Sequence, residues 1–432
     1  MLDIQFIRDN PDLVAEKSLQ KGYKVDVKKL LSVDEQYRQL KQQADELRAK
    51  RNEHTASIKG AKPTDAQIKA GKAIKEELAE LEEKLGKAET EQTELLKAVP
   101  NMPLDEVPVG DHEDKNVVTK TVGTKLNFDF KPQTHGTIGE AKGWIDKERA
   151  AKVAGARFAY LKGDLARLEF ALWQYGIDTL TNEDILKKII KDNKLKVSSK
   201  PFEFILPPAV AKTKVFEATG RLNKEEQTYK LEDDDLWLNA SAEHTLAPMF
   251  LNETIDEAEF PIRYVGYTTA FRREAGTYGK DTDGIFRLHQ FNKLEMESFN
   301  TPEQAYQEHL FLIAIQEYLM QELKLPYQVI EKCTADIGFP NAKGVDINTW
   351  LPGQDNYRET HTADYITDFQ TRSMKTKVKR QDGSTQLAHT NDATAFSERP
   401  LAAIIENYQT KDGNVRIPKV LQQYMGNKEM LK

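Results

Sequence analysis

The stretch FRREAGTYGKDTDGIFRLHQFNKLEM, residues 271–296, decides how the fold of this chain is interpreted. Its two ends, Phe271–Glu274 and Ile285–Glu295, have the composition of strands, and the segment between them is rich in Gly and Asp, as hairpin loops are. Because side chains alternate along a strand, one face carries charged groups and an aromatic ring: Arg272, Glu274, Arg287, His289, Phe291 and Glu295. From the residues alone, an exposed hairpin with cross-strand ion pairs and a nucleotide site explain this face equally well.

The sequence around this hairpin alternates short strand-like runs with helical ones. The strand-like runs are FEFILPPAV (202–210), WLNAS (237–241) and IRYVGYTTAF (262–271), and the helical ones include AYQEHLFLIAIQEYLMQEL (305–323) and LAAIIENYQ (401–409). Short strands at loop-length spacings favour a mainly antiparallel sheet flanked by helices. We therefore predict an α+β domain over residues 116–432.

The N-terminal part has the apolar spacing of a coiled coil. Spacings of four and three connect Val33, Tyr37, Leu40, Ala44 and Leu47, and a second series connects Ile74, Leu78, Leu81, Leu85, Ala88 and Leu95. Gly60, Pro63 and Gly71 interrupt the pattern between the two series. This predicts two long antiparallel helices joined at a tip, within residues 1–99. Three prolines in PNMPLDEVPVG then mark an extended linker, residues 100–115.

Positive charge is concentrated at the tip of this helical hairpin. Residues 48–72 hold seven basic residues (Arg48, Lys50, Arg51, Lys59, Lys62, Lys69 and Lys72) and two acidic ones, a net charge of +5, whereas the whole chain carries −7. Periodicity alone favours a solvated structural rod. A basic tip on an acidic chain instead favours contact with the phosphates of RNA.

Composition excludes several classes of protein. With 432 residues the chain exceeds a usual domain, so at least two folding units are expected. Its single cysteine, Cys333, cannot form an internal disulfide or a Cys-rich zinc site. No apolar run reaches the length of a membrane span, and the N-terminus MLDIQFIRDNPDLV lacks the pattern of a secretory or organelle signal. We therefore expect a cytoplasmic protein without a membrane association.

The stretch 271–296 resembles motif 2 of the class II aminoacyl-tRNA synthetases, and its RxEAGxxGxDTxGxxRxHQFxKxEM form resembles the seryl-tRNA synthetases in particular. The similarity extends along most of the chain. Other segments resemble the family's tRNA-binding arm (the helical hairpin), the start of its catalytic domain (GARFAYLKGDLARLEFAL), motif 1 (FILPPAV), its TxE serine loop (ASAEHTL), its ATP and metal segment (NYRETHTADYITDFQTR) and motif 3 (ERPLAAIIENYQTKDGNVRIPKVLQQYMG). This implies an ATP-dependent serine–tRNA ligase that forms a homodimer and binds tRNA(Ser), with tRNA(Sec) left open.

The resemblance also implies roles for individual residues. ATP contacts are implied for Arg272, Arg273, Glu274, Arg287, Leu288, Phe291, Glu359, Thr360, His361, Thr362 and Arg399, with Arg272 and Arg399 as the catalytic arginines. Mg²⁺, which prefers oxygen ligands, would be held by Glu359 and Thr362. L-serine contacts are implied for Ser241, Glu243, Arg272, Glu295 and Thr394. We expect His289 to be a structural residue, because this chemistry needs no general base.

Three departures from the family pattern accompany the resemblance. The segment TNDATAFSERP is one residue shorter than the pattern, so either Thr394 or Ala393 holds the motif 3 serine contact. Glu398 stands where a small residue or proline is usual, and could pair with Arg399 or repel phosphate. His361 replaces a serine of the usual ExSS segment. Two rival functions are a ligase that loads a carrier protein, which needs no basic tip, and a non-catalytic coiled-coil adaptor, which predicts lost motif arginines.

Overall fold

The computed structural model describes residues 1–58, 62–222, 228–274 and 283–432. The chain divides into two compact units, Met1–Met102 and Pro103–Lys432, and the division lies inside the segment 100–115 predicted as a linker. Across the described ranges, we find no helix that is both long and apolar enough to cross a membrane.

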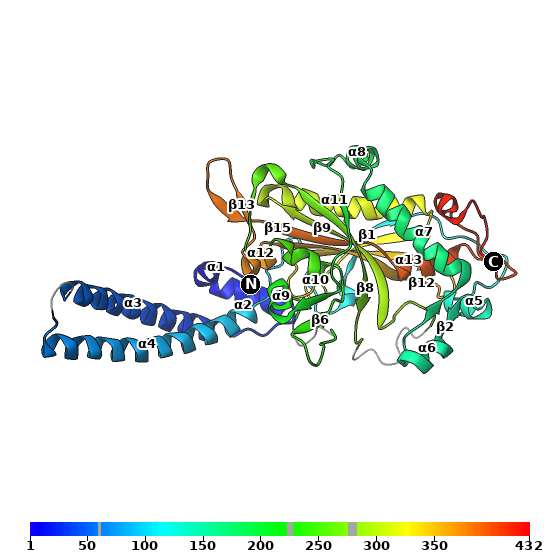
Figure 1. The fold of residues 1–432 in the computed structure, drawn as a ribbon. Coiled ribbons are helices and arrows are strands. Elements are labelled where there is room, and N and C mark those ends of the chain that lie inside the picture. Colours follow the sequence, from blue (N-terminus) through cyan, green and yellow to red (C-terminus); the bar gives the residue numbers. More distant parts are fainter. Residues whose placement is uncertain (59–61, 223–227, 275–282) are drawn as a thin grey trace. The chain divides into compact units, whose positions relative to one another are not determined.

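The first unit is a helical hairpin preceded by two short helices (Figure 1). Its helices are α1 (Ile4–Asp9), α2 (Pro11–Gln20), α3 (Val27–Ser57) and α4 (Asp65–Lys97). The Asp26 carboxylate caps α3 by accepting a hydrogen bond from the Lys29 N–H. Apolar side chains of α3 and α4 pack together along the predicted seam: Ala44, Leu47, Leu78, Leu81 and Leu85. The predicted pair of long antiparallel helices is confirmed.

Helix α4 begins earlier than the apolar spacing indicated. A capping box between Thr64 and Gln67 starts the helix at Asp65, so Gly71 lies inside it and is not a break. A Cβ at Gly71 would lie 3.0 Å from the His54 ring of α3, so the glycine permits close approach of the two helices. Pro63 precedes the cap, and the predicted tip residues Lys59 and Gly60 lie outside the described residues.

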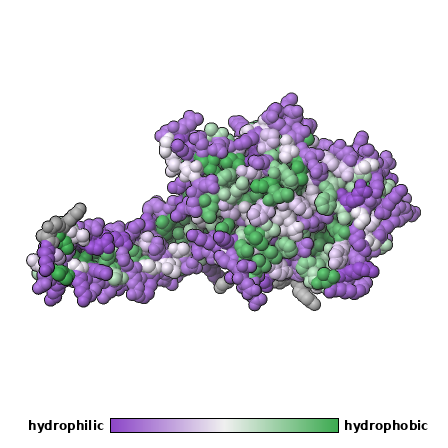
Figure 2. All heavy atoms as spheres, in the orientation of Figure 1, coloured by the Kyte–Doolittle hydropathy of each residue, from purple (hydrophilic) through white to green (hydrophobic). Residues whose placement is uncertain are grey.

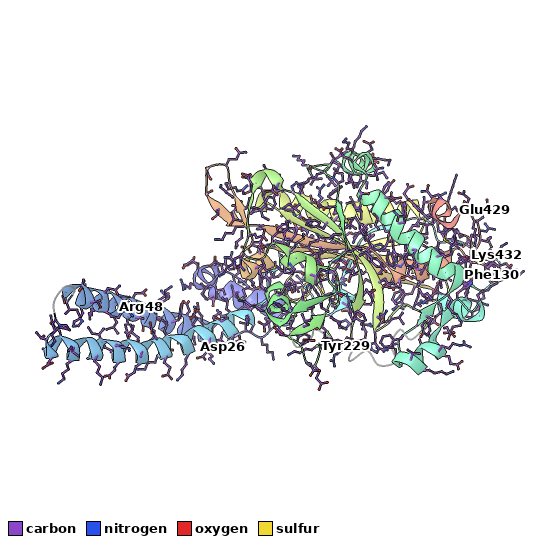
Figure 3. All side chains as sticks on the ribbon, in the orientation of Figure 1. Asp26, Arg48, Phe130, Tyr229, Glu429 and Lys432 are labelled. Atoms are coloured by element: carbon purple, nitrogen blue, oxygen red, sulfur yellow. The ribbon has the colours of Figure 1, made fainter. Side chains whose placement is uncertain are left out.

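Polar contacts between α3 and α4 supplement the apolar seam. Arg48, labelled with Asp26 in Figure 3, contacts Glu82 of α4 at 2.8 Å. Asp34, whose side chain is buried, accepts hydrogen bonds from Arg8 (2.7 and 2.8 Å), Arg38 (3.3 Å) and Gln92 (2.6 Å). Burial raises the pKa of Asp34, but its contacts with Arg8 and the other donors outweigh burial and lower the pKa below the ordinary value. On the face shown in Figure 2, mostly hydrophilic residues cover these helices.

The second unit is built on an eight-stranded sheet with the order β1-β10-β11-β12-β15-β9-β8-β4 (Figure 1). The strands are β1 (Val117–Val122), β4 (Glu203–Ile205), β8 (Ile262–Phe271), β9 (Gln290–Asn300), β10 (Tyr327–Glu331), β11 (Lys343–Leu351), β12 (Asn356–Thr367) and β15 (His389–Ser397). Neighbouring strands are antiparallel except β4 and β8, which are parallel. The predicted α+β sheet flanked by helices is confirmed.

Helices and small sheets surround the main sheet. The helices are α5 (His135–Ala141), α6 (Lys147–Ala154), α7 (Gly163–Leu180), α8 (Glu183–Asp192), α9 (Thr213–Thr219), α10 (Glu243–Leu246), α11 (Pro302–Glu322), α12 (Phe369–Met374), α13 (Glu398–Asn407) and α14 (Lys419–Gln422). The short strands are β2 (Ile145–Asp146), β3 (Tyr160–Leu161), β5 (Val210–Lys212), β6 (Leu236–Leu238), β7 (Thr254–Asp256), β13 (Lys377–Lys379) and β14 (Thr385–Leu387).

The two faces of the main sheet differ in chemistry. Side chains of one face, including Met296, Ile347, Ala363 and Ala393, join a continuous apolar core with helices α7, α11 and α13. The alternate residues of the same strands are polar and point to the opposite face: Lys293, Glu295, Asp346, Thr362, Asp364, Asp392 and Thr394. The polar face is where the candidate site lies.

The predicted strands of the stretch 271–296 are too long. Strand β8 ends at Phe271, and β9 begins only at Gln290, so Arg272–Glu274 and Ile285–His289 are not strand. Glu274 has a positive φ of 50°, and the buried side chains of Ile285, Phe286 and Leu288 join the apolar core instead of alternating. One further hydrogen bond, from Arg272 N–H to the His289 carbonyl, continues the pairing. Residues 275–282 of the predicted loop lie outside the described residues.

Candidate active site

Two adjoining cavities open on the polar face of the sheet. One has a volume of about 230 Å³ and the other about 310 Å³. Five residues line both of them: Arg272, Glu274, Arg287, Lys293 and Thr362. Arg272 follows the end of β8, so its position at the boundary results from the strand that precedes it. A side chain in this place can contact one molecule in each cavity.

The cavities bring together most residues that the family resemblance singled out. The first is lined by Arg272, Glu274, Arg287, Leu288, Phe291, Glu359, Thr360, Thr362, Thr394 and Arg399, and the second by Ser241, Glu243, Arg272, Glu274, Arg287 and Thr362. Among the described residues, three of the predicted ones line neither cavity: Arg273, Glu295 and His361. The implied ATP contacts thus gather mainly around one cavity, and the implied serine contacts around the other.

A β-bulge places the two predicted metal ligands on one face. Glu359 and Thr362 are three residues apart, so regular alternation would point them to opposite faces of β12. The pairing with β11 shifts by one residue there, from His361 opposite Ile347 to Glu359 opposite Asn348. Thr360 is the extra residue, and it restores Glu359 and Thr362 to the same cavity.

A second bulge lies in β15, directly after Thr394 and Ala393, the two candidates for the motif 3 serine contact. Pairing with β9 shifts between Thr394 and Phe396, which makes Ala395 the extra residue. Thr394 lines the first cavity, whereas Ala393 is completely buried in the apolar core. Of these two candidates, Thr394 is the one that faces the site.

Pairs of opposite charge occupy the first cavity. Arg287 Nε lies 2.5 Å from Glu274 Oε2, and Arg399 Nη1 lies 2.8 Å from Glu359 Oε1. The Arg272 guanidinium lies 5.1 Å from the centre of the Phe291 ring, and its Nε donates to the Ala240 carbonyl. The first cavity therefore offers arginines for phosphate groups and a ring for a planar base.

Two of the predicted ATP residues point elsewhere. Arg273 donates to the Thr228 carbonyl and lies 4.9 Å from the Tyr229 ring, because it is adjacent to Arg272 and faces the other way. His361 is buried, its Nδ1 is 2.9 Å from Thr360 Oγ1, and burial lowers its pKa to about 3. His289 bonds the Arg272 carbonyl through Nδ1, which agrees with the structural role expected for it.

The second cavity is strongly charged. Ser241 Oγ donates to Glu295 Oε2 at 3.2 Å, and Glu295, which is completely buried, forms an ion pair with Lys293 of the cavity lining. Glu243 is buried at the start of α10, where its Oε1 accepts from Arg221 (2.8 Å) and Gln370 (2.7 Å). Although burial raises the pKa of Glu243, the charge of Arg221 and these hydrogen bonds lower it to about 2. A carboxylate that stays ionised suits a ligand with a positive charge.

Several lining residues received no role from the sequence. Lys293 shares the period-two spacing of Glu295 on β9, so that spacing could have identified it. Lys332 and Arg221 lie outside strands and helices, where no periodicity predicts which way a side chain points. They enter the site only through the tertiary fold.

Glu398 lines the first cavity, and its carboxyl group contacts Asn292 and Glu169. Its Oε1 accepts from the Asn292 N–H, and its carboxyl group lies beside that of Glu169. Burial, and then the neighbouring Glu169, raise the pKa of Glu398 well above its ordinary value. Burial and Glu169 thus favour the protonated form of the Glu398 carboxyl group.

An antiparallel sheet with arginines, a ring and carboxylates on its polar face defines the class II aminoacyl-tRNA synthetases. Residues 227–408 match the model of the tRNA synthetase class II core domain (G, H, P, S and T), and residues 1–103 match the seryl-tRNA synthetase N-terminal domain. The chain is 38% identical over 436 residues to a serine–tRNA ligase of Thermodesulfovibrio yellowstonii, with 99% of each chain covered. This chain belongs to the seryl-tRNA synthetase family, as its sequence predicted.

Other relatives agree with this assignment. A serine–tRNA ligase of Pseudothermotoga lettingae is 36% identical, with 99% of each chain covered. The crystal structure of seryl-tRNA synthetase from Pyrococcus horikoshii complexed with ATP is 34% identical and has a TM-score of 0.87 over 100% of this chain and 99% of that one. A prolyl-tRNA synthetase of Giardia lamblia, 14% identical with a TM-score of 0.55 over 67% of this chain and 55% of that one, shares the fold alone.

Proposed function

We propose that this chain activates L-serine with ATP, releases pyrophosphate, and transfers serine from the adenylate to the 3′-terminal ribose of tRNA(Ser). Membership in the family and full-length relatives named serine–tRNA ligase support the activity. The observation that carries the residue assignment is the position of Arg272 at the boundary of the two cavities. From there its guanidinium reaches both the serine carboxylate and the α-phosphate.

The reaction requires positioning and charge stabilisation, without a protein nucleophile. The serine carboxylate attacks the α-phosphorus, and Arg272 holds the two reactants together. Phe291 stacks on adenine, Glu274 accepts from its amino group, and Leu288 contacts it through the backbone. Arg287 and Arg399 bind the outer phosphates, and both already lie in the first cavity. The phosphates of bound ATP would replace the carboxylates of Glu274 and Glu359 as the partners of these two guanidinium groups.

The chemistry of the donors fits Mg²⁺. Oxygen atoms of Glu359 and Thr362 share the first cavity, and Thr362 Oγ1 donates to the Asp346 carboxylate. Within the described residues no cluster of three or more His, Cys, Asp or Glu could hold a metal ion. That agrees with Mg²⁺, which commonly takes one or two carboxylates together with substrate phosphates. Glu359 and Thr362 would hold the ion, whose charge would offset that of the phosphates.

Serine would occupy the second cavity. Glu243 would receive its ammonium group and Ser241 would bond its polar atoms, since both line that cavity. We also assign serine contacts to Glu295, which accepts a hydrogen bond from Ser241 but lines neither cavity, and to Thr394, which lines the adjoining first cavity. A pocket that hydrogen-bonds a hydroxyl rejects alanine, because its own polar groups would be left unpaired. We also propose that the basic tip of α3 and α4 binds tRNA, that motif 1 around Pro208 contributes to a homodimer, and that the protein is cytoplasmic.

Pyrophosphate exchange with each amino acid, followed by transfer to bulk tRNA, tests the proposal. Only serine should support exchange, and tRNA(Ser) should then be charged. Exchange without charging would favour the carrier-protein ligase, and no exchange would favour the adaptor. Arg272→Ala should reduce exchange by at least about 100-fold. A variant with near-normal exchange would remove Arg272 from its assigned role.

A further inference from the structure

Arg221 is a charged residue of the second cavity to which the sequence assigned no role. Helix α9 ends at Thr219, and Gly220 follows in the left-handed conformation with φ 73°. A side chain at this φ is unfavourable, and a Cβ would also lie 3.0 Å from the Phe369 ring. This glycine ends α9, and the Arg221 side chain that follows it lines the cavity, only 14% of it exposed.

Arg221 faces three carboxylates that come from three different elements. Its Nε donates to Glu243 Oε1 of α10 at 2.8 Å, and its Nη2 lies 3.6 Å from Asp392 of β15 and 3.8 Å from Asp364 of β12. Behind Asp392, Glu297 of β9 is its cross-strand partner and is completely buried. Three carboxylates lie close to one guanidinium group, and its positive charge offsets their mutual repulsion and holds them together.

Gln370 of α12 completes the arrangement around Glu243. Its Nε2 donates both to Glu243 Oε1 at 2.7 Å and to the Thr219 carbonyl at 3.1 Å. The end of α9, the start of α10 and helix α12 are therefore joined at one carboxylate oxygen. Two donors to the same oxygen fix the plane of the Glu243 carboxylate, so its direction toward the cavity is determined before any ligand arrives.

We propose that Arg221 is a positioning residue of the serine pocket, which orients Glu243 for the substrate ammonium and separates it from Asp364 and Asp392. This inference rests on the proposed function, since it takes Glu243 as the ammonium contact. The low pKa of Glu243, which the charge of Arg221 and its hydrogen bond lower against burial, agrees with this arrangement. Of the three carboxylates, Glu243 is the one that Arg221 contacts at hydrogen-bond distance.

Steady-state exchange kinetics test this role. Arg221→Gln should raise the KM for serine by at least about tenfold while the KM for ATP stays within about twofold, because only the serine side loses its orientation. Arg221→Lys keeps the charge with fewer fixed donors, and should recover part of the loss. Equal rises of both KM values would overturn the proposal, since they indicate a general structural defect.

A pair of adenylate analogues reports on the ammonium contact itself. One is seryl-sulfamoyl adenosine, and the other has a hydrogen in place of the ammonium group. Wild-type protein should prefer the first, and Arg221→Gln should reduce that preference by at least about tenfold, by weakening binding of the first analogue alone. An unchanged preference in Arg221→Gln and Arg221→Lys would contradict the inference.

Two further variants separate the possible failures. Arg380 is a matched control, because it is 18% exposed and contacts two carboxylates, Glu257 at 2.6 Å and Glu303 at 2.7 Å, outside both cavities. Arg380→Gln should leave both KM values unchanged. Glu243→Gln tests the pocket assignment: an unchanged serine KM there refutes the proposed serine site. A raised serine KM in Glu243→Gln together with a normal one in Arg221→Gln refutes only the role of Arg221.

Discussion

Arg399 of α13 donates a hydrogen bond to Glu359 of β12 at 2.8 Å, which joins a proposed phosphate ligand to a proposed metal ligand. The two charges neutralise each other inside the first cavity. Arg287 and Glu274 form a comparable pair at 2.5 Å. Arg287 and Arg399, the two arginines proposed to bind the outer phosphates, are therefore each held in the first cavity by a carboxylate.

Arg399→Ala should impair the ATP side of the reaction selectively. We expect kcat/KM for ATP in pyrophosphate exchange to fall by at least about 100-fold, because the variant loses charge stabilisation of the outer phosphates. The KM for serine should change little, since Arg399 lines only the first cavity. An equal loss on the serine side would show that Arg399 supports the whole site and does not act on ATP alone.

Glu295→Ala should abolish serine activation and leave the fold intact. The variant leaves Lys293 without its ion-pair partner and removes an oxygen bonded by Ser241. Glu297→Gln is a matched control on the same face of β9: burial, and then nearby Asp392, raise the pKa of Glu297 well above its ordinary value, which favours the uncharged form that glutamine mimics. Circular dichroism and exchange assays check both, and near-normal exchange by Glu295→Ala would remove it from the pocket.

Neutralising Lys59, Lys62 and Lys69 should weaken tRNA binding without affecting adenylate formation. Lys62 and Lys69 are exposed, and each lysine lost from a phosphate contact should reduce the slope of log affinity against log salt by about 1. Neutralising Lys84, Lys87 and Lys97 of α4 changes the net charge equally and serves as the control. If both triple variants bind tRNA alike, the tip has no special role.

Asp34 should make the first unit sensitive to acid. Its pKa is lowered in the folded state, so its stabilising effect is present above the pKa of the unfolded chain and is lost as pH falls through the folded pKa. Asp34→Asn should destabilise the unit by about 1–3 kcal/mol near neutral pH, with little difference below both pKa values. Hydrogen exchange of α3 amides at several pH values measures this, and a constant difference would contradict it.

Glu398→Gln should have the opposite dependence on pH. The raised folded pKa of Glu398 means that the unfolded chain releases this proton first, so stability falls as pH rises above the unfolded value toward the folded one. Glutamine removes this loss. The variant should therefore have a higher Tm than wild type at about pH 8, and a similar Tm at about pH 4. A lower Tm at both pH values would show that the carboxyl hydrogen bonds matter more than its protonation.

Periodic patterns predicted the long elements of this fold well. The apolar seam from Ala44 to Leu85 gave the helical hairpin, and strand β8 has the bounds that its composition indicated. The strand ends around Arg272 and His289 were wrong, because Ile285 and its neighbours enter the core and break alternation. Local sequence does not show where tertiary packing overrides the period of a strand.

The resemblance to the family predicted most of the residues that line the cavities, but it did not predict how their side chains are arranged. It could not show that Thr360 and Ala395 are extra residues in their strands, because a bulge depends on the partner strand. Arg221 was missed for a related reason, since its three carboxylate partners lie 22 to 171 positions further along the chain. Contacts of this kind appear only when the sheet is assembled.

The two bulges also determine where the chain can change its length. Removing one residue from a paired strand inverts every side chain beyond it. At Thr360 or Ala395 the strand already has one residue more than its neighbour. A deletion there would straighten β12 or β15 without shortening the sheet: Glu359 would then stand two positions from Thr362 and keep its face, and Thr394 would stay opposite Glu295. During divergence of this family, these two positions are therefore where a one-residue gap would leave Glu359, Thr362 and Thr394 on the face of the site while the core stays packed.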